Sequence, residues 1–421
     1  MCLRRNLLLL FCLFNQILFA NAKKLSVDSL YKTRDMQDII NSFFKRKSYN
    51  DTTGSHSNLS LLPSVGYNPS YGLEFGIIVS GGKNYGDPAN TTFSVFNTNV
   101  FVSTNGLASA EFKHNTFSNH NIWNLQGGYQ VGRTVALDYG VGTGHAHQSD
   151  DNFVFNGLPV DNNPGVLPIK FTYLKLYEKV YRKLFDNFYA GMGIIVDGYQ
   201  NIDKPKKGAV RRHSHNTWYS TENKYPSIGY WANGVLFNFQ YNSRDYLNRP
   251  YKGIYADVVL RLNAEGLGSE HSATQLKTEF RKYWSLSSAN PEHVLAFWLW
   301  GNYLLKGSIP YLELPGTGTD AEERSGRPYT IGRFKGTSFY FNELEYRYPI
   351  TGNKLLSGVA FVNIQTGSNQ QKIHLFERWN SGEGVGLRLL FNKYTRSNIC
   401  MDYGAGNYGA RGLFIGLNEV F

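Results

Sequence analysis

Hydrophobic and polar residues alternate with a period of two along short segments of the chain between residues 59 and 421. One segment carries apolar residues at every second position, Ile254, Ala256, Val258, Leu260 and Leu262. The positions between them are mostly polar, among them Tyr255, Asp257, Arg261 and Asn263. A period of two predicts a β-strand with one apolar and one polar face. The same alternation recurs over residues 275–286.

Clusters of Gly, Asn, Asp and Pro separate the alternating segments and predict turns. Asn105-Gly106 lies between two such segments and is typical of a two-residue hairpin turn. The segment 173–184 also fits a helical stripe. The Asp186-Asn187 turn that follows it, with a further alternating segment beyond, favours a hairpin instead.

Residues 59–421 show no repeat period and no change of composition, so we expect one all-β domain. At about ten residues per strand, this length supplies roughly 15–18 strands. Strands with one face for lipid and one for water fit a closed transmembrane antiparallel β-barrel, in which strand numbers are usually even. We therefore expect about sixteen strands.

The N-terminal part of the chain has the pattern of an export signal. Residues 1–22 comprise a basic start, an apolar run and an A-x-A cleavage pattern that ends at Ala22. The apolar run is too short and too interrupted for a transmembrane helix. Residues 23–58 are expected to form a short periplasmic leader with one helix around residues 36–44.

Composition supports a barrel and argues against a disulfide-stabilised fold. The chain contains 43 Gly, 29 Tyr and 28 Phe, and its mean hydropathy is -0.36. Nothing after residue 22 resembles an apolar membrane-spanning helix. Removal of the signal leaves Cys400 as the single cysteine, so no internal disulfide is expected.

The charge balance is basic, with 43 Lys and Arg residues against 32 Asp and Glu residues. Loss of Arg4 and Arg5 with the signal reduces the net charge from +11 to +9. Because an exported protein rarely meets nucleic acid, we expect contact with outer-membrane lipid and the phosphates of lipopolysaccharide instead. A solvated barrel lumen is the alternative use of the charge.

Signatures of catalysis and metal binding are missing from the sequence. It contains no G-x-S-x-G nucleophile elbow, no H-E-x-x-H motif and no phosphate-binding glycine loop between a strand and a helix. His145 and His147 lie near Asp150 and Asp151, but in a polar segment that is typical of a surface loop. We expect no enzymatic activity, no catalytic residues, no cofactor and no metal site.

One predicted strand carries charges that need a watery environment. In residues 338–350, Glu343, Glu345 and Arg347 share one parity, opposite Leu344 and its apolar neighbours. Charges on a membrane-spanning strand are expected to face the lumen, because lipid penalises them. These three side chains could simply neutralise one another there.

Five segments, in order along the barrel region, resemble the motifs of one family. They are residues 61–73, 242–255, 324–336, 343–349 and 358–363. The family signature positions within them include Arg244, Asp245, Pro250, Gly253, Gly332, Arg333, Phe334 and Gly336. In these motifs the chain resembles the BamA/TamA superfamily of outer-membrane assembly and translocation barrels, in its surface-antigen branch.

The resemblance implies that a long loop folds back into the barrel. That loop would carry Arg327 and Tyr329 in a motif similar to the family's R-G-Y motif. Its guanidinium would then meet Glu343 and Glu345 on the lumen face, and a guanidinium can hold a carboxylate through two hydrogen bonds. These contacts would fix the loop inside the barrel.

Three departures from the family pattern matter. Pro328 stands where the family usually has glycine, which restricts the loop backbone. Asn363 stands where the family has the aspartate that receives the loop arginine, so a neutral hydrogen bond is expected to replace that salt bridge. Residues 23–58 are too short for the POTRA domains that collect client proteins in the family, so either a separate periplasmic partner supplies that function or the protein has a narrower one.

The end of the chain also fits the family. Leu417 and Phe421 lie on one face of an alternating segment, and a terminal phenylalanine resembles the insertion signal of outer-membrane barrels. The simpler interpretation is a strand that closes the barrel. The resemblance implies a weak seam between a first strand near residues 72–82 and a last strand near residues 411–421.

The expected function is to assist insertion or translocation of client proteins at the bacterial outer membrane, with lipids as a further candidate cargo. A passive, porin-like channel is the rival function, and an outer-membrane enzyme ranks below both. A channel should conduct more when the Arg327 loop is removed, whereas an assembly factor should bind client strands at the seam. The sequence leaves open the clients, the partner and the oligomeric state.

Overall fold

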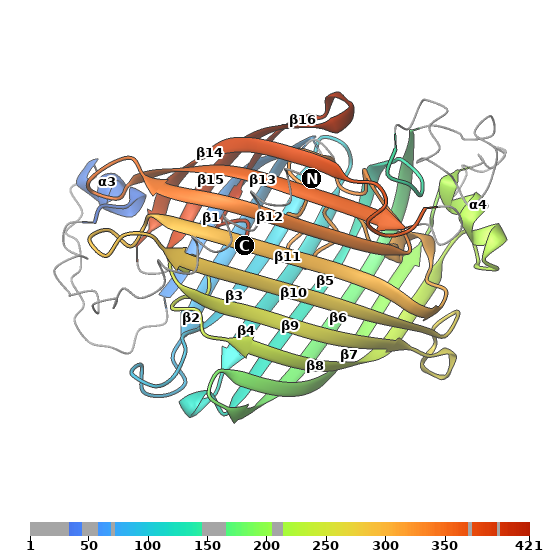
Figure 1. Ribbon diagram of the computed structural model, residues 1–421, viewed down its shortest axis with the longest axis horizontal. Helices are drawn as coiled ribbons and strands as arrows, with labels where there is room; N and C mark the ends of the chain where they lie inside the picture. Colours follow the sequence, from blue (N-terminus) through green and yellow to red (C-terminus); the bar gives the residue numbers. More distant parts are fainter. Residues whose placement is uncertain are drawn as a thin grey trace, which may run out of the picture.

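Sixteen antiparallel β-strands close into a barrel in the computed structural model of the chain (Figure 1). The structure describes residues 33–43, 58–68, 72–144, 166–203, 214–368, 373–393 and 396–421. The predicted signal peptide lies outside the described residues, as do His145, His147, Asp150 and Asp151. The predicted strand number and the all-β class are confirmed.

The strands follow one another around the barrel in chain order. They are β1 (Asn58–Asn68), β2 (Gly72–Lys83), β3 (Ser94–Ser103), β4 (Ala108–Phe117), β5 (Trp123–Asp138), β6 (Leu167–Phe185), β7 (Phe188–Gln200), β8 (Tyr230–Asn242), β9 (Gly253–Asn263), β10 (Ala273–Ser285), β11 (Val294–Gly307), β12 (Ser338–Pro349), β13 (Leu356–Ser368), β14 (Asn380–Asn392), β15 (Ser397–Gly406) and β16 (Arg411–Leu417). The helices are α3 (Met36–Phe43), α4 (His215–Glu222), η1 (Asn119–Asn121), η3 (Glu265–Leu267), η4 (Tyr311–Glu313) and η5 (Asn407–Gly409).

Both hairpins that the turn signals favoured are present. β3 and β4 pair up to Val102 opposite Ala108, on either side of the Asn105-Gly106 turn. β6 and β7 pair up to Phe185 opposite Phe188, so the segment with the ambiguous helical stripe is a strand. Cross-strand pairing in the sheet therefore overrides the helical spacing of its apolar residues.

The two faces of the strands differ as the alternation predicted. Val258 on β9 is exposed on the outside, whereas its lumen-facing neighbours Asp257 and Arg261 are buried. The same holds on β12, where Leu344 is exposed and Glu345 is buried. The outer face is thus apolar for lipid, and the charged face looks into the barrel.

The connections at the two ends of the barrel differ in length. The three longest join β5 to β6, β7 to β8 and β11 to β12, and these strand pairs are connected at the end that carries α4, opposite the end where α3 lies (Figure 1). Because membrane barrels have short periplasmic turns and long outer loops, the α3 end is the periplasmic end. No helix in the described parts of the chain combines the length and apolarity needed to cross a membrane.

Helix α3 docks on two periplasmic turns. Asp35 accepts a hydrogen bond of 2.9 Å from the main-chain N–H of Lys393, whose ammonium lies 2.8 Å from Asp38. The main-chain N–H of Arg34 donates to the carbonyl of Asn353 at 3.0 Å. Burial acts to raise the pKa of Asp38, but its bonds to Lys393 and to the Asp35 main chain outweigh this and lower the pKa.

Candidate functional site

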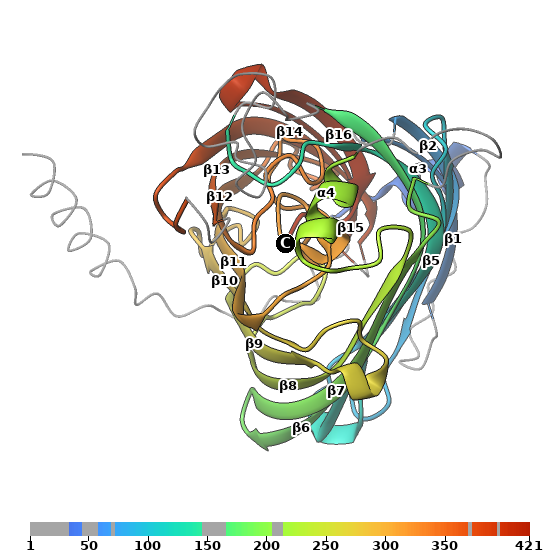
Figure 2. The ribbon, with the colours of Figure 1, turned by 90° about the vertical axis from the view of Figure 1, so that its right-hand side faces the viewer.

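The connection between β11 and β12, residues 308–337, folds back into the barrel, and we call it the inward loop. Figure 2 looks into the barrel from the α4 end and shows this segment inside the ring of strands. Tyr311 and Phe334 of the loop are completely buried. Lys335 forms isolated β-bridges with Gly142 and with Gly316, so the loop pairs with itself and with the β5–β6 connection.

Arg327 of the inward loop lies among three carboxylates. Its Nη1 donates to Oδ2 of Asp402 at 2.5 Å, and its Nη2 donates to Oε2 of Glu345 at 2.8 Å and to Glu343. The guanidinium also covers the ring of Phe361 at 3.8 Å from its centroid. Both glutamates have no exposed surface. Such charge-assisted bonds in a buried setting fix the loop firmly.

Asn363 lies beside this cluster and bonds to the loop without a charge. Its Nδ2 donates to the main-chain carbonyl of Arg327 at 2.6 Å and to Glu343 at 3.1 Å. The expected neutral hydrogen bond at position 363 is therefore present, and Arg327 is held by Glu343 and Glu345 together with a third carboxylate that the sequence analysis did not identify, Asp402 on β15. No motif in the sequence marked Asp402 as a partner of the loop arginine.

Arg388 continues the cluster towards the end of the chain. Its Nη1 donates to Asp402 at 2.5 Å and its Nε donates to Glu419 at 2.7 Å. Glu419 also pairs with Arg249 from the turn between β8 and β9 at 3.3 Å. The arginine–carboxylate network then joins four guanidinium groups to four side-chain carboxylates: Arg249, Arg327, Arg347 and Arg388 with Glu343, Glu345, Asp402 and Glu419.

The last residues of the chain lie inside the barrel. β16 ends at Leu417, and Asn418 at a φ of 68° turns the chain inward. Phe421 stacks on Trp298 with ring centroids 5.3 Å apart, and its main-chain oxygen accepts 2.8 Å from Arg347. The predicted placement of Phe421 on the same face as Leu417 is therefore wrong. Figure 2 marks the C-terminus within the ring of strands.

Arg324 of the inward loop causes this change of direction. Its Nη2 donates to the main-chain oxygen of Leu417 at 2.6 Å. Its Nη1 donates to the oxygens of Asn418 at 3.0 Å and Glu419 at 2.7 Å. These bonds hold the segment beyond Leu417 against the inward loop, while the main-chain N–H of Asn418 still donates to the carbonyl of Asn398 on β15 at 2.7 Å.

Tyr329 fastens the inward loop to the outer part of the barrel wall. Its hydroxyl donates to the carbonyl of Ser381 and accepts from the main-chain N–H of Asn407 at 2.6 Å. Its ring meets the ring of Phe334 with centroids 4.9 Å apart. The two predicted loop residues Tyr329 and Phe334 thus pack together. The loop's bonds to the buried carboxylates of Glu343, Glu345 and Asp402 come from Arg327.

The remaining motif residues of the loop shape its backbone. Gly332 has a φ of 72°, which strains any residue with a side chain. A Cβ on Gly336 would lie 2.3 Å from the carbonyl of Ser368, so only glycine fits there. Arg333 donates to the carbonyl of Gly144 at 3.0 Å and binds the loop to the β5–β6 connection.

A second anchor of the inward loop was missed in the sequence. Glu313 pairs with Arg261 on β9 at 3.0 Å and accepts from the hydroxyl of Tyr199 at 2.6 Å. Arg261 also pairs with Asp197 on β7 at 2.9 Å. The parity of Arg261 placed it in the lumen, but no motif marked its partner in the loop.

The mid-barrel signature residues shape the turn between β8 and β9. Asp245 accepts 2.9 Å from the main-chain N–H of Tyr251, and Pro250 is buried. Gly253 has a φ of 112°, and Arg244 covers the ring of Tyr255 at 4.4 Å. None of the four signature residues contacts the inward loop within the described structure.

The seam between β1 and β16 is short. Among the described residues, one register pair joins these strands, Tyr67 opposite Ile415. Continuing this register would place residues 58–64 of β1 opposite the positions after Leu417. β16 has ended there, and the chain has turned into the barrel. The predicted first strand, residues 72–82, is in fact β2, because the chain enters the barrel one strand earlier.

The described residues contain no cluster of three His, Cys, Asp or Glu side chains suited to a metal ion. The arrangement combines three structural features. They are a buried network that holds the inward loop, an inward-turned chain end and a stretch of β1 that is paired on one side only among the described residues. Such an arrangement can present a strand edge to another extended segment.

Comparison with known proteins agrees with this architecture. The chain is similar in fold to BamA from Haemophilus ducreyi lacking POTRA domains 1–3, with a TM-score of 0.54, 13% identity and coverage of 94% of this chain and 82% of that one. It is also similar to CdiB from Escherichia coli (TM-score 0.52, 8% identity, 87% and 67% covered) and from Acinetobacter baumannii (TM-score 0.50, 11% identity, 86% and 65% covered).

A comparison with curated proteins gives no match. The family profile of the Omp85 superfamily domain matches residues 64–406, which is most of the chain and spans the inward loop and all strands from β2 to β15. The chain therefore belongs to the Omp85 superfamily.

Proposed function

We propose that this protein assists the insertion or translocation of client proteins at the bacterial outer membrane, to which it is exported by its N-terminal signal. The open edge of β1 carries this proposal. Residues 58–64 pair with β2 on one side, and among the described residues no strand lies on the other side. The interior position of the chain end beyond Leu417 keeps this edge free.

An unpaired strand edge recruits other strands. Its N–H and C=O groups point sideways, and pairing with an extended segment satisfies them. Within a bilayer this tendency is stronger, because lipid offers unpaired backbone groups no hydrogen bonds. A client segment that pairs with β1 would therefore gain main-chain hydrogen bonds as soon as its first residues align with the strand.

The inward loop sets the state of this edge. Arg324 holds the carbonyls of Leu417 and Asn418, and the arginine–carboxylate network connects Arg327 to Glu419 through Asp402 and Arg388. A change in the loop would therefore reach the end of β16. We assign the loop a positioning role and no chemical step.

Docking of α3 on the periplasmic turns gives a place for a separate partner. Its bonds to Lys393 and Asn353 hold the helix at the periplasmic end, where clients would arrive. The outer apolar face binds membrane lipid, and the basic balance favours lipopolysaccharide phosphates.

Site-specific photocrosslinking in host membranes tests the proposal. A photoreactive residue replaces Val65 on β1, which is 64% exposed, and a matched variant carries it at Val258 on β9, which is 41% exposed. We expect a defined set of membrane or surface proteins to crosslink at position 65 alone. Equal products at both positions, or none at position 65, would contradict the proposal.

A further inference from the structure

The outer wall of β4, β5 and β6 carries a bonded group of polar side chains. Nε2 of His114 lies 3.1 Å from Oε2 of Glu178. The same carboxylate oxygen accepts 2.6 Å from the hydroxyl of Tyr129. Two ionisable side chains and a phenol thus meet on one face of three neighbouring strands.

This group faces the lipid. Lys113 donates 2.8 Å to the main-chain oxygen of Ala321 in the inward loop, so Lys113 points into the lumen. Successive side chains of a strand point to opposite faces, so His114 points outward. Glu178 bonds to both His114 and Tyr129, so all three side chains lie on this outer face, where Tyr129 is 38% exposed.

The position along the barrel places the group within the apolar band. Arg182 of β6 lies opposite Trp123, 5.6 Å from its ring, at the periplasmic rim. Glu178 is four residues further into the strand, which corresponds to about 13 Å along its axis. Its outward neighbours on β6 are Leu176 and Val180. Ionisable side chains at such a depth are costly and are a mark of functional sites.

The backbone is adapted to this group. Gly127 of β5 lies directly between His114 and Glu178 in the register of the three strands. A Cβ at Gly127 would lie 2.2 Å from Oε2 of Glu178 and 2.3 Å from Nε2 of His114. The pair therefore forms only because position 127 has no side chain.

Two polar atoms on this face remain unsatisfied. Oε1 of Glu178 has no hydrogen-bond partner among the described residues, and it accepts bonds. The hydroxyl of Thr98 on β3, in the row of Tyr129, has no partner in the same part of the structure, and it can donate. One face thus offers both an acceptor and a donor to the membrane.

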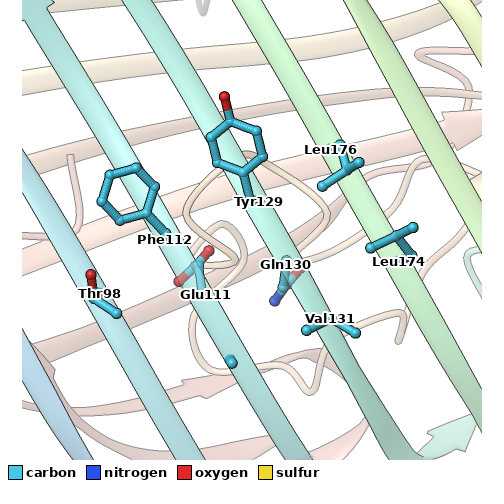
Figure 3. A pocket seen from close by; sticks show the side chains of 9 residues that line it. Thr98, Glu111, Phe112, Tyr129, Gln130, Val131, Leu174 and Leu176 are labelled. Atoms are coloured by element: carbon cyan, nitrogen blue, oxygen red, sulfur yellow. The ribbon is translucent and has the colours of Figure 1, made fainter.

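A groove of about 220 Å³ adjoins the group. Figure 3 shows Phe112, Tyr129 and Leu176 side by side across β4, β5 and β6. The small side chain of Ala110 lies in the next row, beside Val131. The face therefore has projecting rings next to a hollow, and it is exposed along Val131, which is 53% accessible.

We propose that this face, His114, Glu178, Tyr129 and the groove, is the contact surface for a second copy of this chain within the membrane. A two-fold pair brings the same patch to both sides, so each copy can supply the donor, acceptor, ring or hollow that the other lacks. Association within lipid depends on such close packing and on hydrogen bonds between polar side chains.

Crosslinking tests the surface in vesicles of phosphatidylethanolamine and phosphatidylglycerol. Cys400 is first replaced by Ser, and a cysteine is then placed at Val131 or, as matched control, at Val258 on β9. A short bismaleimide should give dimers with the Val131→Cys protein and none with the Val258→Cys protein. Single-molecule photobleaching should show two steps for the same preparation.

A second variant tests the polar group itself. His114→Leu combined with Glu178→Leu makes the face fully apolar, and the barrel should fold as before. We expect its dimer dissociation constant to rise about three- to tenfold, the size of one or two hydrogen bonds across a membrane interface. A monomer in vesicles, equal crosslinking at both positions, an unchanged dimer of the leucine variant, or capture of a different protein at position 131 in host membranes would overturn the proposal.

Discussion

Nη2 of Arg324 donates a hydrogen bond of 2.6 Å to the main-chain oxygen of Leu417, the last residue of β16. The inward loop thereby determines where the final strand stops. Arg324→Ala should free the segment beyond Leu417. We expect a loss of about 1.5–3 kcal/mol in the free energy of unfolding, the value of a hydrogen bond to a charged group.

Hydrogen exchange of residues 417–421 measures this directly. Exchange should accelerate in Arg324→Ala, and it should stay unchanged in the matched variant Arg378→Ala, whose side chain is exposed. Unchanged protection in both variants would show that another contact holds the chain end.

Loss of the loop arginine should be more severe. Arg327→Ala leaves Glu343, Glu345 and Asp402 buried without their shared cation, and breaking a buried ion pair from one side costs about 3–5 kcal/mol. Denaturant unfolding in vesicles should show this loss, and proteases should cut the inward loop. Lys252→Ala, at an exposed periplasmic position, should match the wild type. A wild-type unfolding curve for Arg327→Ala would refute the role assigned to the network.

The number of carboxylates in the network predicts what happens when Asn363 is replaced by the aspartate that the family has at this position. Asn363→Asp replaces a donor to Glu343 by a carboxylate, so we expect a loss of about 1–3 kcal/mol in unfolding free energy. Adding Asp402→Asn returns the number of anions to four and should recover much of that loss. Additive losses in the double variant would show that positions 363 and 402 are not equivalent.

Docking of α3 should be weak and insensitive to mild acid. Lys393→Ala removes a partly exposed ion pair worth about 0.2–1 kcal/mol, so exchange of residues 36–43 should rise by at most about fivefold. The pKa of Asp38 is lowered from its ordinary value of 3.8, so the ion pair is complete above that pH and is lost only below it. Protection of α3, corrected for intrinsic rates, should therefore be equal at pH 7 and pH 5. A fall in protection by pH 5 would assign docking to another group.

Local patterns were sufficient for the parts of the fold that depend on neighbouring residues. Alternation placed Glu343, Glu345 and Arg347 in the lumen, and Asn105-Gly106 marked a hairpin, because strand faces and tight turns follow from nearby sequence. The expectation that Arg327 meets the two glutamates came from the family resemblance, and Arg327 does bond to both in the structure.

The parts that could not be predicted depend on distant contacts. Asp402 and Glu419 join the network from strands and segments far along the chain, and nothing in their local sequence identifies their partners. The alternation that included Phe421 continues past Leu417 in the sequence, but the chain turns inward there, where Arg324 donates hydrogen bonds to its carbonyls. Local periodicity cannot detect a competing hydrogen-bond donor from a loop.

The first strand was placed one strand too late. In residues 58–68 Leu59, Leu61, Val65 and Tyr67 alternate with mostly polar or small residues, and Pro63 interrupts this strand pattern. A strand with one free side tolerates proline more readily than a central strand does. The proline in β1 is thus consistent with an edge strand.

The most direct measurement closes the seam and asks whether the protein still works in its host. Tyr67 lies opposite Ile415, so a cysteine pair at these positions in a Cys400→Ser background should form a disulfide across the seam. The host is depleted of the wild-type protein and supplied with the paired variant or with Tyr67→Cys alone, and the outer-membrane proteome is quantified. We predict that a defined set of barrel or surface proteins disappears on depletion and returns with the single variant but not with the paired one. Full restoration by the disulfide-closed barrel, or a proteome unaffected by depletion, would contradict the proposed role and favour a passive channel.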